Sequence, residues 1–180
     1  MLNNLELVTS YFTKKNEIGK QIASKIDVSE ISFEEKISVL QEIRILINSN
    51  GMERAGAHRL DSWNSGWSQI AEKFTDEPCI DSLIPQYFGK HKYVRIKSEF
   101  YRANQIETEL LFLRLIQSKL FSKYLCSEKF QAETLFEFGC GTGHNLIFAR
   151  KFHPEIKLYG LDWSIESQKI LKAIQESGLE

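Results

Sequence analysis

The sequence predicts an α/β protein: a mostly helical N-terminal region, residues 1–130, followed by alternating strands and helices in residues 131–180. Two observations carry this prediction. Apolar residues recur at helical spacing through much of the first part, and a β-prone run followed by a glycine-rich turn opens the second. The composition, 42% hydrophobic, is that of a folded chain with a core.

Charge and cysteine usage narrow the function classes. With 23 basic and 24 acidic side chains, the net charge of -1 gives no global attraction to nucleic acid or to an anionic membrane. We expect a cytoplasmic protein, because no secretory signal and no apolar run approaching ~18 residues is seen. Cys79, Cys126 and Cys140 lie far apart and at no metal-ligand spacing with a histidine, so we expect neither disulfides nor a metal site.

Helical patterns come first along the chain. Residues 1–30 predict one or two short amphipathic helices, interrupted near Asp27. Ser32 and Glu35 form a capping-box pattern, and the apolar residues after them predict a long helix that ends at 48–51, a cluster of asparagine, serine and glycine.

The middle of the chain is less regular. Residues 51–98 hold four glycines, two prolines and many aromatic residues, so we expect irregular but packed structure, with a short strand at 93–96. An apolar stripe over 105–125 predicts a second long helix, and the stripe is so wide that this helix must be covered on more than one side.

The last quarter predicts strand, turn, helix and strand. A β-prone run over 134–138 leads directly into a glycine-rich turn over 139–143 and then into a helical pattern that ends near Pro154. A second strand over 157–161 is followed by Asp162. Parallel strands joined in this way have their C-termini at one edge of the sheet, where ligands bind.

The final helix and the acidic residue complete this unit. Ser164 is placed to cap a helix that ends near Gly178. Glycines let the backbone turn sharply and let a ligand approach it, and the carboxylate of Asp162 can accept two hydrogen bonds from a ribose diol.

The glycine spacing separates two classes of nucleotide. Dinucleotide sites have G-x-G-x-x-G, whereas this turn has G-x-G-x-G, with Glu137 two residues before the first glycine. A carboxylate there suits a ligand with an amino group better than a pyrophosphate, which disfavours an NAD(P)-dependent oxidoreductase.

The segment Phe136-Glu-Phe-Gly-Cys-Gly-Thr-Gly-His144 resembles the first motif of class I S-adenosylmethionine-dependent methyltransferases, and Leu161-Asp-Trp-Ser164 resembles their second-strand acidic motif. The resemblance covers about residues 134–180 and implies a Rossmann-like fold with S-adenosyl-L-methionine as cofactor. It implies that Asp162 holds the ribose hydroxyls and that Trp163 lies against the adenine. The turn residues that it implies at the methionine end are Glu137, Gly139, Cys140, Gly141 and Gly143, of which we interpret Cys140 as a small apolar filler and not as a nucleophile.

The chain also departs from this family. The family's sheet has seven strands with helices on both faces, so we expect these 180 residues to be part of a longer enzyme or a unit completed by other contacts. The catalytic residues are therefore not predicted.

The acceptor site is predicted from side-chain chemistry alone. Residues 58–67 mix two indoles with charged groups in what we expect to be a glycine-bounded loop, and such a mixture suits a small polar acceptor such as a sugar. The candidate substrate residues are Arg59, Asp61, Trp63, Tyr101 and Arg102. The alternative is that Trp63 and Trp67, four residues apart, lie on one face of a buried helix.

Two functions from different classes follow. The first is methyl transfer to a small-molecule acceptor, with no nucleic-acid or membrane partner and with a homo-oligomer as an option. The second is a non-catalytic binding or assembly module that retains part of the methyltransferase fold and pairs with a partner.

Overall fold

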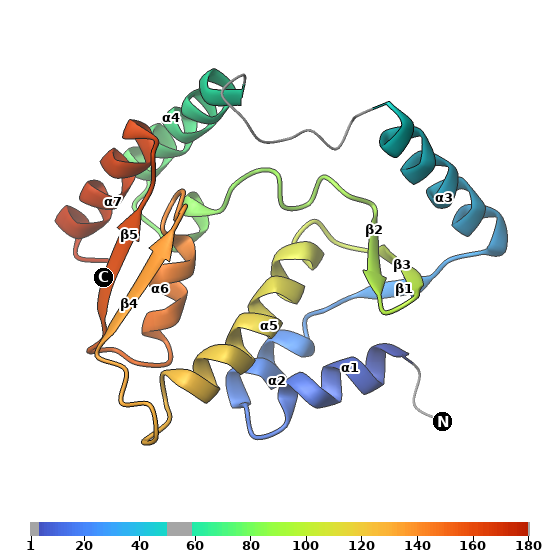
Figure 1. The fold of residues 1–180 in the computed structure, drawn as a ribbon, viewed down its shortest axis with the longest axis horizontal. Coiled ribbons are helices and arrows are strands. Elements are labelled where there is room, and N and C mark those ends of the chain that lie inside the picture. The colour runs from blue at the N-terminus through green and yellow to red at the C-terminus, as the bar shows by residue number, and fades with distance from the viewer. Residues whose placement is uncertain (1–3, 50–58, 180) are drawn as a thin grey trace. The chain divides into compact units, whose positions relative to one another are not determined.

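The computed structural model describes residues 4–49 and 59–179, which form a mixed α/β protein (Figure 1). These residues contain seven α-helices, an antiparallel three-stranded sheet and a parallel pair of strands. They fall into two compact units: residues 4–49 with 86–119, and residues 59–85 with 120–179. The predicted division at residue 130, between a cap and substrate region and a cofactor-binding domain, stays a prediction.

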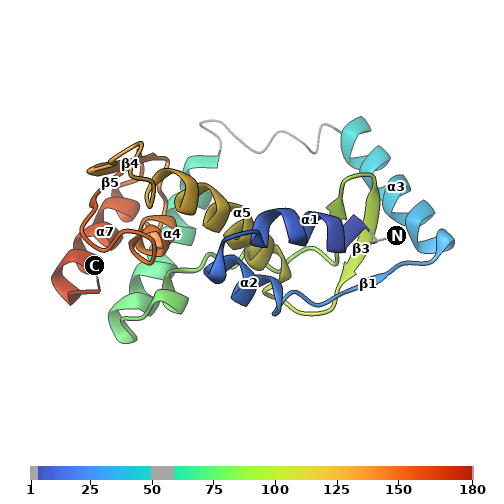
Figure 2. The same ribbon diagram turned by 90° about the horizontal axis from the view of Figure 1, so that it is seen from below.

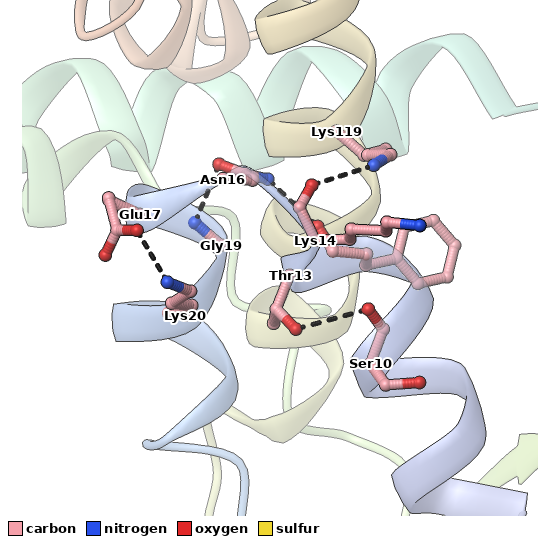
Figure 3. A network of polar contacts seen from close by, with 9 residues as sticks. Ser10, Thr13, Lys14, Asn16, Glu17, Gly19, Lys20 and Lys119 are labelled. Carbon is pink, nitrogen blue, oxygen red and sulfur yellow. Dashed lines mark hydrogen bonds and ion pairs between the residues drawn. The ribbon is translucent and has the colours of Figure 1, made fainter.

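Short helices begin the first unit, as predicted. α1 (Asn4–Thr13) and α2 (Glu17–Ala23) are joined by Asn16, whose buried side chain links them. Its Oδ1 accepts a hydrogen bond from Gly19 N at 3.0 Å (Figure 3). Its Nδ2 donates to the carbonyl of Phe12 and to Ser118 Oγ. A buried amide with every group satisfied fixes the angle between the two helices.

The longer helices at 33–48 and 108–124 are also confirmed. α3 (Phe33–Asn48) begins at Ser32 with both hydrogen bonds of the capping box. α5 (Thr108–Tyr124) begins three residues after the expected start, and its first part, up to residue 119, belongs to the first unit.

An antiparallel sheet completes the first unit (Figure 2). Its order is β1 (Val28–Glu30), β3 (Glu99–Ala103) and β2 (Tyr93–Ile96). The strand at 93–96 was predicted, whereas β1 and β3 were not. Three residues carry too little pattern to predict a strand, and β1 exists because β3, about 70 residues later in the chain, supplies its hydrogen-bond partners.

The second unit contains the predicted strand, turn, helix and strand. β4 (Thr134–Phe138) and β5 (Lys157–Leu161) have the predicted bounds and pair in parallel, with Phe138 opposite Leu161. α6 (His144–Arg150) connects them, and α7 (Ile165–Ser177) follows β5. α7 ends at Gly178, as the sequence predicts, and this glycine has the left-handed conformation, with φ 69°.

Helix α4 (Leu60–Asp76) corrects the expectation of irregular structure between residues 51 and 98. Trp67, Ile70 and Phe74 lie on one face of α4 and are buried against α7 (Figure 1). Burial of three large side chains outweighs the helix penalty of Gly66, which is about 1 kcal/mol. The short 3₁₀ turn Ile80–Leu83 follows α4 and packs on it.

The two faces of the β4–β5 pair differ. Leu135 and Leu158 pack on the cluster formed by Leu125, Ala149 and Ile156. The opposite face, here called the aromatic sheet face, is exposed and consists of Phe136, Phe138, Tyr159 and Leu161. Because parallel strands are normally covered on both faces, this exposed apolar surface is unusual.

Among the described residues, every helix is too short or too polar to cross a lipid bilayer.

Candidate functional site

The glycine-rich turn between β4 and α6 is built from three left-handed residues. Gly139, Gly141 and Gly143 have φ of 69°, 54° and 72°, a region that costs other residues about 1–2 kcal/mol. Glycine is therefore the residue type that forms this turn without strain.

The three glycines have different surroundings. A Cβ on Gly139 would meet nothing within 4 Å, so this side of the turn is open. A Cβ on Gly141 would lie 3.2 Å from the indole of Trp67, and a Cβ on Gly143 would lie 2.7 Å from Leu171 Cδ2. Gly141 and Gly143 thus permit close packing by α4 and α7, while Gly139 leaves room for a ligand to approach the backbone.

Asp162, directly after β5, is hydrogen-bonded to the glycine turn that follows β4. Its Oδ2 accepts a hydrogen bond from Gly141 N at 2.8 Å, and its Oδ1 accepts one from Ser164 N at 2.9 Å. The carboxylate therefore lies against the glycine turn. Each oxygen keeps a second lone pair, so the group can still accept hydrogen bonds from a diol.

The turn is also tied to β5 through the backbone. Gly139 N and Cys140 N donate to the carbonyl of Leu161 at 2.7 and 3.2 Å. These bonds join the turn to the C-terminal end of β5. Trp163, two residues after β5, is 61% exposed, so its indole is available to a flat ligand.

Glu137 lies just before the turn and is half-buried. Its Oε1 accepts a hydrogen bond from Asn145 Nδ2 at 2.8 Å. Asn145, in the first turn of α6, therefore orients this carboxylate. The sequence analysis missed Asn145, although an amide in the first turn of the helix after the glycine turn is a pattern that predicts a partner for Glu137.

Cys140 is buried, with 3% of its surface exposed, and its Sγ lies 3.9 Å from Ser167 Oγ. Burial raises the pKa of its thiol to about 11, so the nucleophilic thiolate is scarce at neutral pH. The interpretation of Cys140 as a filler agrees with this geometry.

Ser164 corrects one expectation. It occupies the N-cap position of α7, but its hydroxyl makes no capping hydrogen bond. The hydroxyl donates instead to Asn64 Oδ1 of α4 at 2.9 Å, because a partner from another helix is within reach.

The predicted acceptor residues divide between the two units. Trp63 lies on α4 in the second unit and stacks on Trp67, with ring centroids 5.5 Å apart. The alternative, in which both indoles lie on one face of a helix, is therefore confirmed. The expectation of a loop over residues 59–67 is wrong, and residue 58 lies outside the described residues. Arg59 directly precedes α4, and Asp61 is an exposed residue of its first turn.

Tyr101 and Arg102 belong to β3 of the first unit. Tyr101 is buried, and burial raises the pKa of its hydroxyl. The guanidinium of Arg102 pairs with Glu35, and this hydrogen bond lowers the pKa of the Glu35 carboxyl. Both residues therefore have structural partners in their own unit.

No three side chains of the types that bind metals gather in a candidate metal site within the described residues. The arrangement around the turn can instead offer a ligand the carboxylates of Glu137 and Asp162 and, directly after Asp162, the exposed indole of Trp163.

Comparisons of the chain with protein-family models, with curated proteins and with solved structures each found no match.

Proposed function

We propose that this chain carries the S-adenosylmethionine-binding part of a Rossmann-like class I methyltransferase. One observation carries the proposal: the Asp162 carboxylate at the end of β5 contacts a turn of three left-handed glycines at the end of the parallel strand β4. A carboxylate and an open glycine turn at adjacent strand ends form an arrangement suited to a nucleoside.

Charge favours this cofactor over a dinucleotide. Glu137 and Asp162 place two carboxylates beside the turn, where a pyrophosphate would be repelled and an ammonium or sulfonium group attracted. In this proposal Glu137 lies near the amino group of the methionine end, Asp162 holds the ribose hydroxyls and Trp163 lies along the adenine. The open side of Gly139 provides the approach.

When bound, the cofactor supplies a methyl group on a sulfonium, which is a good leaving group. The protein's contribution is then chiefly alignment of the acceptor with that methyl group, with a general base needed only for a hydroxyl acceptor. We propose a small polar acceptor, of which a sugar is an example, and the candidate acceptor residues that belong to the same unit as the turn are Arg59, Asp61 and Trp63.

Calorimetric titration with S-adenosylhomocysteine tests the cofactor site. The wild-type chain is expected to bind it saturably, and Asp162→Ala is expected to lose binding, because the diol loses its acceptor. Asp76→Asn, an exposed carboxylate on α4, is the matched control and should bind like the wild type. Saturable binding of NADH, with none of S-adenosylhomocysteine, would refute the proposal.

The second candidate is a non-catalytic assembly module, and the aromatic sheet face favours it. Phe138 is 80% exposed and Phe136 is 56% exposed, more than a stable monomer usually leaves uncovered on one sheet. A folded chain that binds no S-adenosylhomocysteine, but sediments as a defined oligomer that Phe138→Lys disrupts, would favour this function over methyl transfer.

A further inference from the structure

Helix α4 packs on the glycine turn and is linked to Asp162 through Ser164, although α4 lies far from both in the sequence. Trp67 is buried, and two atoms of its indole would lie 3.2 Å from a Cβ on Gly141. The ring therefore covers the Cα of the central glycine of the turn. A side chain at that glycine, or a displacement of α4, would change the shape of the turn.

Gly141 is held on three sides. Its N–H donates to Asp162, its carbonyl accepts a hydrogen bond from the hydroxyl of Ser167, and its Cα faces Trp67. With both backbone groups and one face fixed, the left-handed conformation of this residue is maintained before any ligand arrives. Such preorganisation lowers the cost of binding.

A second contact runs from α4 to the carboxylate. Asn64 Oδ1 accepts the Ser164 hydroxyl at 2.9 Å, and Ser164 N donates to Asp162 Oδ1 at 2.9 Å. Ser164 is 1% exposed, so this hydrogen bond is shielded from water. Asn64 thus orients Asp162 through one intervening residue.

From these contacts we propose that α4 is part of the cofactor site, with Trp67 and Asn64 as positioning residues that hold Gly141 and Asp162 in the ligand-binding geometry. This inference rests on the proposed function. It goes beyond the glycine and acidic motifs, because neither motif contains a residue of α4.

Packing alone does not account for Asn64. Trp67 also belongs to the apolar cluster with Ile70 and Phe74, so its loss lowers stability as well. Asn64 lies on the same helix, but its described hydrogen bond is to Ser164, a polar contact next to the ligand-binding carboxylate. The amide therefore separates positioning from core packing.

The test is calorimetric titration of S-adenosylhomocysteine with thermal melting in parallel. Asn64→Ala is expected to weaken binding about 10-fold, the low end of the effect of removing a group that orients a ligand-binding residue. Ser65→Ala, an exposed neighbour on α4, is its matched control and should leave Kd unchanged. Ser164→Ala should weaken binding as Asn64→Ala does, and the double variant should be no weaker than either single variant.

Trp67→Phe and Trp63→Phe form the second matched pair. Both remove an indole from α4, but only Trp67 covers Gly141, so Trp67→Phe should raise Kd more than Trp63→Phe does.

The outcomes are distinct. A wild-type Kd retained by folded Asn64→Ala and Trp67→Phe, with only the melting temperature lowered, would overturn this inference and leave the proposed function standing. A wild-type chain that binds no S-adenosylhomocysteine would overturn both.

Discussion

Substitution of Gly143 by alanine tests how the glycine turn is packed against α7. Two costs arise at this position. A left-handed φ of 72° costs a non-glycine residue about 1–2 kcal/mol. The new Cβ would lie 2.7 Å from Leu171 Cδ2, and overpacking of this kind costs about 1–3 kcal/mol. Gly143→Ala should therefore lower the free energy of unfolding by about 2–5 kcal/mol.

Two further glycines provide matched controls. Gly139 and Gly178 both have φ of 69°, and a Cβ on either meets nothing within 4 Å. In their alanine variants, the free energy of unfolding should thus fall only by the conformational cost, about 1–2 kcal/mol each. Of these two, only Gly139→Ala should weaken binding of S-adenosylhomocysteine, because its methyl group projects into the open side of the turn.

Urea unfolding followed by circular dichroism gives the free energies. In a chain that already carries Leu171→Ala, Gly143→Ala should cost little more than its conformational part, because the methyl group that the new Cβ would meet is gone. Equal destabilisation by Gly143→Ala and Gly178→Ala, or an excess cost that persists with Leu171→Ala, would refute the packing argument.

Three other predictions concern single groups. In a chain with Cys79 and Cys126 replaced by serine, Cys140 should not react with a thiol reagent at pH 8 until urea is added, because burial raises its pKa to about 11; prompt reaction would contradict this. The Arg102 hydrogen bond lowers the folded-state pKa of Glu35 from 4.5, so its stabilisation is present above pH 4.5 and is lost as pH falls through the lowered pKa. Urea unfolding should accordingly show wild type and Arg102→Gln converging below pH 4.5, and a constant difference down to the acid limit would be inconsistent with this pair. Phe138→Lys should lower the binding of a hydrophobic dye and change the free energy of unfolding by less than about 0.5 kcal/mol; a larger loss would mean that Phe138 is covered in solution.

Local patterns were sufficient for several elements. The capping box predicted the start of α3, and the β-prone runs predicted β4 and β5 with their bounds. These features depend on residues within a few positions of one another, so they are visible in the sequence. The same is true of the three glycines, whose conformation is required by the turn itself.

The sequence offered a helix at α4 only as the alternative to a loop, because the start of α4 has no local signal. Arg59 occupies the N-cap position and makes no side-chain capping hydrogen bond, and Gly66 lowers the helix propensity of the segment. What stabilises α4 is burial of its apolar face in the second unit. Propensity is a weak force, and tertiary packing overrides it here.

For the candidate site, the sequence determined the identity of the turn, the acidic residue after β5 and the exclusion of Cys140 as a nucleophile. Only the tertiary structure decided what surrounds them: Trp67 on Gly141, Asn145 on Glu137, and Asn64 on Ser164 across a separation of 100 residues. The physical reason is the separation along the chain over which each feature is determined. A turn's backbone conformation is set by its own residues, whereas the side chains that cover it are chosen by how distant helices pack.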